Sequence, residues 1–173
     1  MSIRAEELEM SFSLDGTTFS VLGGERAITT PARDMNMKMS DMPPKWAEKQ
    51  AKLLDQPKFG QRDYFVTKFS LMDGSKERAN ISFETIVYKD QKTAMALLIG
   101  TLSHMTFLRL TKVEVGDVGA MIEVRGRADR RLKAVAFVER NVFGLIMLSA
   151  ATDYTVSDSW LISMARLMVS RMR

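Results

Sequence analysis

The C-terminal stretch, residues 134–173, constrains the fold more than any other part of the chain. Two runs rich in valine, isoleucine and phenylalanine, 132–138 and 142–148, flank a Glu-Arg-Asn sequence at 139–141. β-branched and aromatic runs separated by a short polar sequence are typical of two strands joined by a tight turn. The pattern therefore predicts a β-hairpin.

The second of these runs is apolar on both sides. One face carries Val142, Ile146 and Leu148, and the other carries Phe143, Leu145 and Met147. Successive side chains of a strand point to opposite faces, so neither face of this strand is polar. A strand of this kind belongs in the middle of a sheet that is covered on both sides.

The segment after the hairpin has helical periodicity. Apolar side chains recur on one face of residues 157–172, namely Trp160, Leu161, Met164, Leu167, Met168 and Met172, with serines and arginines opposite. This spacing predicts an amphipathic helix. We expect it to cover one side of the sheet through Trp160, Met164, Leu167 and Met168.

The rest of the chain alternates between groups of strands and single helices. An opening hairpin, 8–22, is expected to turn at Asp15-Gly16. The remaining elements expected are an extended loop or edge strand over the methionine-rich residues 31–44, a short helix over 45–55 after two prolines, strands over 64–72 and 79–88, a helix after Asp90, and strands over 108–115 and 118–125.

This order of elements predicts an α+β fold with a mostly antiparallel sheet sandwiched between helices. The length, 173 residues, is that of one domain. We therefore expect a single domain, 1–173, composed of the opening hairpin 8–22, the methionine-rich loop 31–44 and a main sandwich over 45–173.

Composition excludes several classes of function. The chain has no cysteine, and its net charge of +4 comes from 25 basic and 21 acidic residues, a mixed surface that does not predict nucleic-acid binding. No apolar run is long enough for a membrane span. As written, the chain is expected in the cytoplasm, with export or lipid anchoring as the alternative if a leader has been removed.

Three short sequences, at 79–86, 115–120 and 138–146, precede a final helix in an order that resembles the PsbP-like, or Mog-type, family. They read Ala-Asn-Ile-Ser-Phe-Glu-Thr-Ile, Val-Gly-Asp-Val-Gly-Ala and Val-Glu-Arg-Asn-Val-Phe-Gly-Leu-Ile. The family includes photosystem extrinsic proteins, a Ran-binding protein, and small bacterial proteins and lipoproteins. The resemblance implies an α/β/α sandwich in a protein that binds other proteins, with no catalytic residue and no cofactor to carry over.

Four methionines in the loop at 31–44 form the first candidate site. Met35, Met37, Met39 and Met42 are separated by polar residues. Thioethers are soft ligands that suit Cu(I), so a copper site is one interpretation. Flexible methionine side chains also fill cores and contact partners, and this second interpretation expects no metal.

Five cations form the second candidate site, which we call the basic segment: Arg125, Arg127, Arg130, Arg131 and Lys133. They surround the turn between two expected strands, and Glu123 and Asp129 are the only acids close by in sequence. A basic hairpin tip can dock on an acidic protein surface, whereas a solvated turn is the plain alternative. Aromatic residues for stacking on bases are absent from this segment.

No motif of a nucleophile elbow, a phosphate loop or a dinucleotide fold occurs in the chain, and the single histidine, His104, is expected at the surface. The leading hypothesis is a non-catalytic binding or accessory module that contacts a protein partner through the basic segment and the methionine-rich loop. The alternative is a carrier of a small ligand or of Cu(I), with its site between sheet and helix or in the methionines. The partner could also be a second copy of the chain, in a homodimer.

Overall fold

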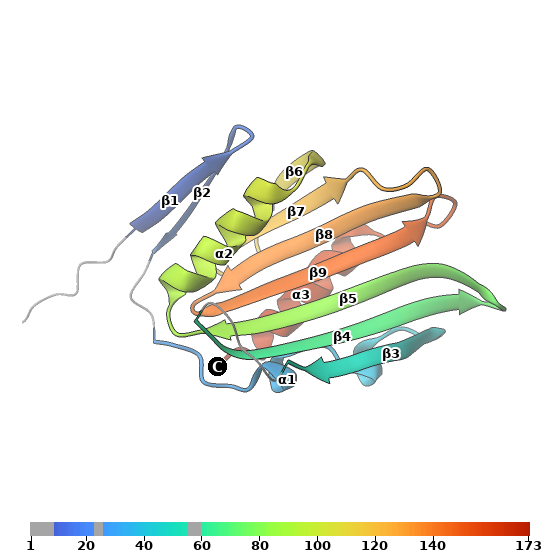
Figure 1. Ribbon diagram of the computed structural model, residues 1–173, viewed down its shortest axis with the longest axis horizontal. Helices are drawn as coiled ribbons and strands as arrows, with labels where there is room; N and C mark the ends of the chain where they lie inside the picture. Colours follow the sequence, from blue (N-terminus) through green and yellow to red (C-terminus); the bar gives the residue numbers. More distant parts are fainter. Residues whose placement is uncertain (1–8, 23–25, 55–59) are drawn as a thin grey trace, which may run out of the picture.

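The computed structural model describes residues 9–22, 26–54 and 60–173, and within them the chain forms one seven-stranded sheet and a separate two-stranded hairpin (Figure 1). Every pair of neighbouring strands is antiparallel. The predicted α+β class with a mostly antiparallel sheet is thus confirmed. From edge to edge the sheet contains β3 (Trp46–Leu53), β4 (Gln61–Asp73), β5 (Lys76–Tyr88), β9 (Val142–Ala151), β8 (Arg130–Glu139), β7 (Val118–Val124) and β6 (Phe107–Val113).

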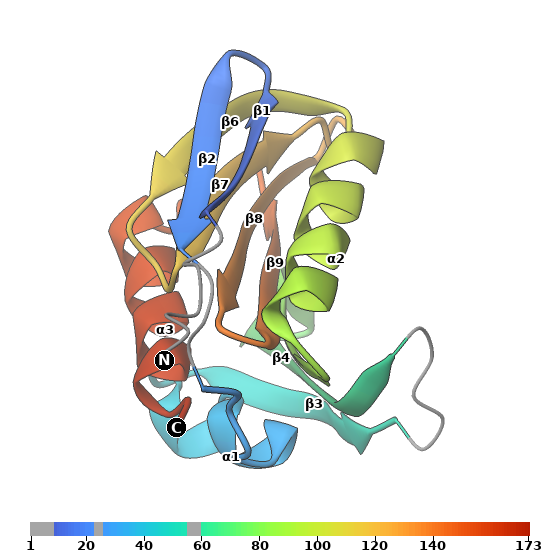
Figure 2. The same ribbon diagram turned by 90° about the vertical axis from the view of Figure 1, so that its left-hand side faces the viewer.

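Strand β9 lies at the centre of this order and is covered on both faces along most of its length, as its sequence predicts, although Met147 is exposed. Ile146 is completely buried on the face that packs against helix α3 (Asp158–Ser170). Phe143 and Leu145 are buried on the face that packs against helix α2 (Gln91–His104). Figures 1 and 2 show these two helices on opposite sides of the sheet.

Both helices begin where the sequence predicted them, one after Asp90 and the other at residues 157–158. The Asp90 carboxylate accepts a hydrogen bond from the backbone N–H of Thr93, and the Ser157 hydroxyl accepts one from that of Trp160. Side-chain oxygens at these positions satisfy backbone donors of the first turn. The most buried line of α3 runs through Leu161, Ala165 and Met168 and continues to Met172 after the helix, whereas Trp160, Met164 and Leu167 are only half-buried.

Two tight turns also agree with the sequence. The hairpin of β1 (Glu9–Leu14) and β2 (Thr17–Leu22) turns at Asp15 and Gly16, whose φ angles are 49° and 73°. Left-handed conformations at both central residues match the right-handed twist of the strands. Residue 8, the expected start of this hairpin, lies outside the described residues. The β8–β9 turn contains Arg140 and Asn141, with Glu139 opposite Val142.

The predicted helix over 45–55 is wrong, because the chain forms strand β3 there. Lys45 adopts a φ of 76° after the two prolines and directs the chain into an extended conformation. Seven of the eight residues of β3 are exposed and only Trp46 is buried. Helix-forming side chains are compatible with such an edge strand, because pairing with β4 outweighs weak local propensity. Asp55 lies outside the described residues.

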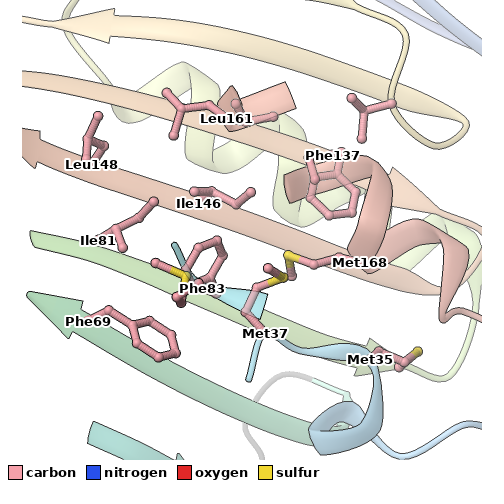
Figure 3. Close-up of a cluster of buried hydrophobic side chains, with 14 of the residues drawn as sticks. Met35, Met37, Phe69, Ile81, Phe83, Phe137, Ile146, Leu148, Leu161 and Met168 are labelled. Carbon is pink, nitrogen blue, oxygen red and sulfur yellow. The ribbon is translucent and has the colours of Figure 1, made fainter. Parts of the chain in front are cut away.

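The methionine-rich residues 31–44 form two short helical turns, α1 (Ala32–Met35) and the 3-10 turn Met39–Asp41, where an extended loop or edge strand was expected. Met35, Met37 and Met42 are at most 8% exposed and belong to the main apolar cluster, whereas Met39 is 41% exposed. In Figure 3 Met37 points into the cluster that contains Phe83 and Met168. This segment therefore completes the core.

A buried asparagine fixes this segment to the sheet. The Asn36 amide donates hydrogen bonds to the carbonyl oxygens of Phe65 and Phe83, both at 2.9 Å, and its side-chain oxygen accepts one from the Thr67 hydroxyl. Asn36 has no exposed surface. A buried amide with its donors and acceptor satisfied specifies one position for the chain, because any shift leaves polar groups unpaired.

A bidentate ion pair fixes the same segment to the end of α3. Arg171 donates to the two carboxylate oxygens of Asp41 at 2.6 and 2.8 Å, and the backbone N–H of Lys38 donates to one of them. These bonds lower the pKa of Asp41, and the side-chain bond from Arg171 is the largest cause. Both side chains are mostly shielded from solvent, so this pair is stronger than an ordinary surface pair.

The central position of β9 predicts opposite results for two neighbouring substitutions. Ile146→Asp places an unpaired charge in the core at a cost of several kcal/mol, comparable with the whole stability of a domain, and should abolish soluble expression. Met147→Asp is the matched control, because Met147 is 42% exposed on the other face. Soluble yield and urea unfolding measure both. A cooperative, soluble Ile146→Asp protein would contradict this assignment of β9.

The Asp41–Arg171 pair predicts a pH-dependent contribution to stability. The pKa of Asp41 is lower in the folded protein than in the unfolded chain, so the pair stabilises above the ordinary aspartate pKa and loses its effect as the pH falls through the folded value. Asp41→Asn should lower the free energy of unfolding by about 2 kcal/mol near pH 7. The difference should shrink near pH 3. Urea unfolding at both pH values checks this, and an equal difference at both would contradict it.

Candidate ligand-binding groove

A groove of about 640 Å³ opens on the α3 side of the sheet, at the end where β4 turns into β5. Three segments that are far apart in sequence form its walls: the start of β3, the β4–β5 hairpin, and the loop from β9 into α3. The lining residues are Pro43, Pro44, Lys45, Trp46, Leu71, Met72, Asp73, Arg78, Tyr154, Thr155, Val156, Ser157 and Trp160. Its size is within the range of small-molecule sites, ~300–1,000 Å³.

Two stacked tryptophans, together with Tyr154, form the aromatic part of this lining. The ring centroids of Trp46 and Trp160 are 5.9 Å apart and the ring planes differ by 19°. Trp46 is the first residue of β3 and Trp160 lies in the first turn of α3. The chain contains only these two tryptophans. All of its tryptophan fluorescence therefore comes from the groove.

The local sequence explains why the rings meet. Proline fixes its own φ and restricts the residue before it, so Pro43-Pro44 delivers the chain to β3 in an extended conformation. On the other wall, the backbone N–H of Tyr154 donates to the carbonyl of Ala151 at 2.9 Å and turns the chain out of β9. Ser157 then caps α3, and the first helical turn presents Trp160 to Trp46.

Charged side chains border this aromatic surface. Arg78 donates to Asp153 at 3.0 Å, with the arginine side chain 18% exposed and the aspartate side chain 66% exposed. The hydrogen bond from Arg78 is the largest cause of a lowered pKa at Asp153. Lys45 and Asp73, both exposed, add one charge of each sign to the lining.

The structure divides the basic segment. Arg130 pairs with Glu77 at 3.4 Å, and Lys133 pairs with Asp158 in the first turn of α3 at 2.6 Å. The other three cations, Arg125, Arg127 and Arg131, are exposed.

One part of the basic segment borders the groove. Arg131 and Lys133 line a small depression whose other wall is formed by Tyr154, Thr155 and Val156, and these three residues also line the groove. The loop 154–156 therefore separates the two hollows.

The structure places three of the four candidate methionines in the core and one at the surface. Met35, Met37 and Met42 are buried in the main cluster among apolar side chains, and Met39 lies apart from them at the surface. Core filling is the interpretation that these positions support. Among the residues that the structure describes, no group of three or more histidine, cysteine or acidic side chains is placed to hold a metal ion. His104 is exposed, as expected, with Nδ1 2.7 Å from the carbonyl oxygen of Gly100.

Sequence reasoning missed Trp46, Trp160 and Arg78 as residues of one site. Trp46 was assigned to a helix and Trp160 to the buried face of another, so their contact was not expected. One signal was present in the sequence, since a chain with only two tryptophans places one directly after Pro43-Pro44-Lys45 and the other three residues after Ser157, at the start of an expected helix. That signal gives no distance between them.

The divided basic segment predicts unequal effects of charge reversal. Arg127→Glu should change the free energy of unfolding by no more than about 0.5 kcal/mol, because the residue is exposed. Arg130→Glu should lower it by about 1 kcal/mol, because it places two carboxylates side by side at Glu77. Urea unfolding at low salt measures both, and equal effects would show that the Arg130–Glu77 pair has no influence on stability.

Comparisons with known proteins give a fold relation and no family. No protein-family model matches the chain, and no curated protein matches its sequence. Among solved structures, the chain is similar to the extracellular domain of PknH from Mycobacterium tuberculosis, with a TM-score of 0.58 and 10% identity over 86% of this chain and 98% of that one. Within the described residues no helix has the length and apolarity that a membrane crossing requires. At this identity the likeness concerns the fold alone.

Proposed function

We propose that this chain is a non-catalytic binding domain whose groove takes the apolar, aromatic part of a small organic ligand. The observation that carries the proposal is the Trp46–Trp160 pair at the groove. Stacked indoles offer a large rigid surface that loses little conformational freedom when a ligand packs on it.

Contact with a protein partner is a second candidate function, and it now rests on part of the basic segment. Arg125, Arg127 and Arg131 are exposed at one end of the sheet and are suited to an acidic protein surface. The methionine-rich loop no longer supports this candidate, because three of its four methionines fill the core. A homodimer is one form that such contact can take.

Membership of the PsbP-like family, with its α/β/α sandwich, is likewise a proposal. It is supported by the antiparallel sheet with α2 and α3 on opposite faces. A location outside the cytoplasm, after removal of a leader, is the alternative that the extracellular setting of the PknH domain favours.

The groove is tested with N-phenyl-1-naphthylamine, a neutral aromatic probe whose absorption overlaps tryptophan emission. Energy transfer from the two tryptophans, which are the only ones in the chain, reports that the probe is bound, and paired variants test whether it is bound in the groove. Thr155 is exposed and lines the groove, so Thr155→Arg should fill it with little effect on stability and weaken probe binding about tenfold or more.

Thr152→Arg is the matched control. Thr152 is exposed in the same loop and outside the lining of the groove, so the same substitution there should leave probe affinity within about twofold. Circular dichroism and urea unfolding confirm that both variants are folded. Absence of energy transfer in the natural protein, or equal loss in the two variants, would refute the proposed binding site.

A further inference from the structure

We infer that the ligand of this groove is an amphipathic organic anion, whose carboxylate or equivalent group binds Arg78 in the place now taken by Asp153. The inference rests on the proposed function and specifies the chemical class of the ligand. The tryptophans receive the apolar part of the molecule, and Arg78 receives its charge.

Arg78 is placed as a receptor for an anion. Its side chain extends from β5 into the lining of the groove and is 18% exposed, so most of it is shielded from water. A guanidinium group presents several donors in a planar fork that matches a carboxylate. A charge-assisted hydrogen bond is stronger where water is partly excluded than at the open surface.

Asp153 is held loosely in comparison. Its side chain is 66% exposed, and it lies in the turn after β9. The backbone of that turn is fixed by hydrogen bonds from Tyr154 to Ala151 and from Thr152 to Asp129, which do not involve the Asp153 side chain. Rotation of the carboxylate into solvent breaks its bonds to Arg78 and to its own backbone N–H, and it requires no change in the backbone fold of the turn. Exposed ion pairs contribute little to stability, so their loss costs little.

The surroundings favour an anion over a cation. Lys45 and Arg78 contribute two positive charges to the lining, against one negative charge at Asp73. The cap of helix α3, Ser157, lies in the groove wall, and the positive end of the helix dipole adds to the field there, while the Asp158 carboxylate of the first turn is paired with Lys133. Once Asp153 leaves Arg78, an incoming carboxylate restores the balance of charge.

The experiment compares two probes that share one aromatic framework. 8-Anilinonaphthalene-1-sulfonate carries a sulfonate, and N-phenyl-1-naphthylamine is neutral. Energy transfer from the tryptophans gives the affinity of each probe for the natural protein, Arg78→Gln and Asp153→Asn. Both variants lose the same ion pair between Arg78 and Asp153. If this pair had only a structural role, both substitutions would shift the affinity for the sulfonate probe in the same direction.

The inference predicts opposite shifts. Arg78→Gln should weaken sulfonate binding about tenfold or more, since a charge-assisted bond is lost. Asp153→Asn should strengthen it about threefold or more, since the competing carboxylate is removed. Affinity for the neutral probe should stay within about twofold in both variants. Shifts of equal sign, or none, with the neutral probe still bound would overturn the inference and leave the proposed function intact.

Displacement of the sulfonate probe identifies the source of the anion. Octanoate should displace it at lower concentration than 1-octanol, which has the same chain without the charge. An acetylated and amidated Glu-Leu dipeptide represents a carboxylate carried by a protein. Displacement by the dipeptide and not by octanoate would overturn the small-molecule assignment. Failure of both probes to accept energy from the tryptophans would instead refute the proposed function itself.

Discussion

Burial of β9 on both faces is the constraint on which the rest of this structure depends. A strand that is apolar on both sides is stable only when a layer of side chains covers each of them, and α2 and α3 supply these layers. Leu161 and Met168 anchor α3 against the β9 face that carries Ile146. The position of α3 in turn brings its first turn to the end of the sheet, where Trp160 meets Trp46. The groove is thus a consequence of how the core is covered.

The N-terminal segment completes this core and requires polar contacts to do so. Met35 and Met37 fill space against β4 and β5, but thioethers are flexible and specify position poorly. Asn36 supplies the specificity, because its buried amide bonds only where the carbonyls of Phe65 and Phe83 lie. The methionine side chains can adapt to several positions of the segment, but the Asn36 side chain can form its hydrogen bonds in only one. The segment therefore has one stable position.

The sequence predicted those parts of the fold that depend on local patterns. The central hairpin, the strands over 64–72 and 79–88 and the cap at Asp90 follow from periodicity and turn chemistry, and the structure contains all of them. Strand β3 was mistaken for a helix because an edge strand with seven exposed residues carries no alternating apolar signal. Its extended conformation comes from pairing with β4, which no local pattern reveals.

The candidate site was less predictable, for the same physical reason. A groove whose walls come from the start of β3, one hairpin and the start of α3 exists only after the sheet has assembled. The basic segment illustrates the point within a single strand. Arg130 and Lys133 are separated by an odd number of positions on β8, so they point to opposite faces and pair with Glu77 and with Asp158. Closeness in sequence made them look like one patch.

The loop 154–156 links the two surfaces that remain. It forms one wall of the groove and one wall of the depression beside Arg131 and Lys133. Tyr154 and Val156 also pack against the main apolar cluster, so the loop is held between the core and both hollows. The ligand proposed for the groove would therefore contact the same three residues that form one wall of the depression beside Arg131.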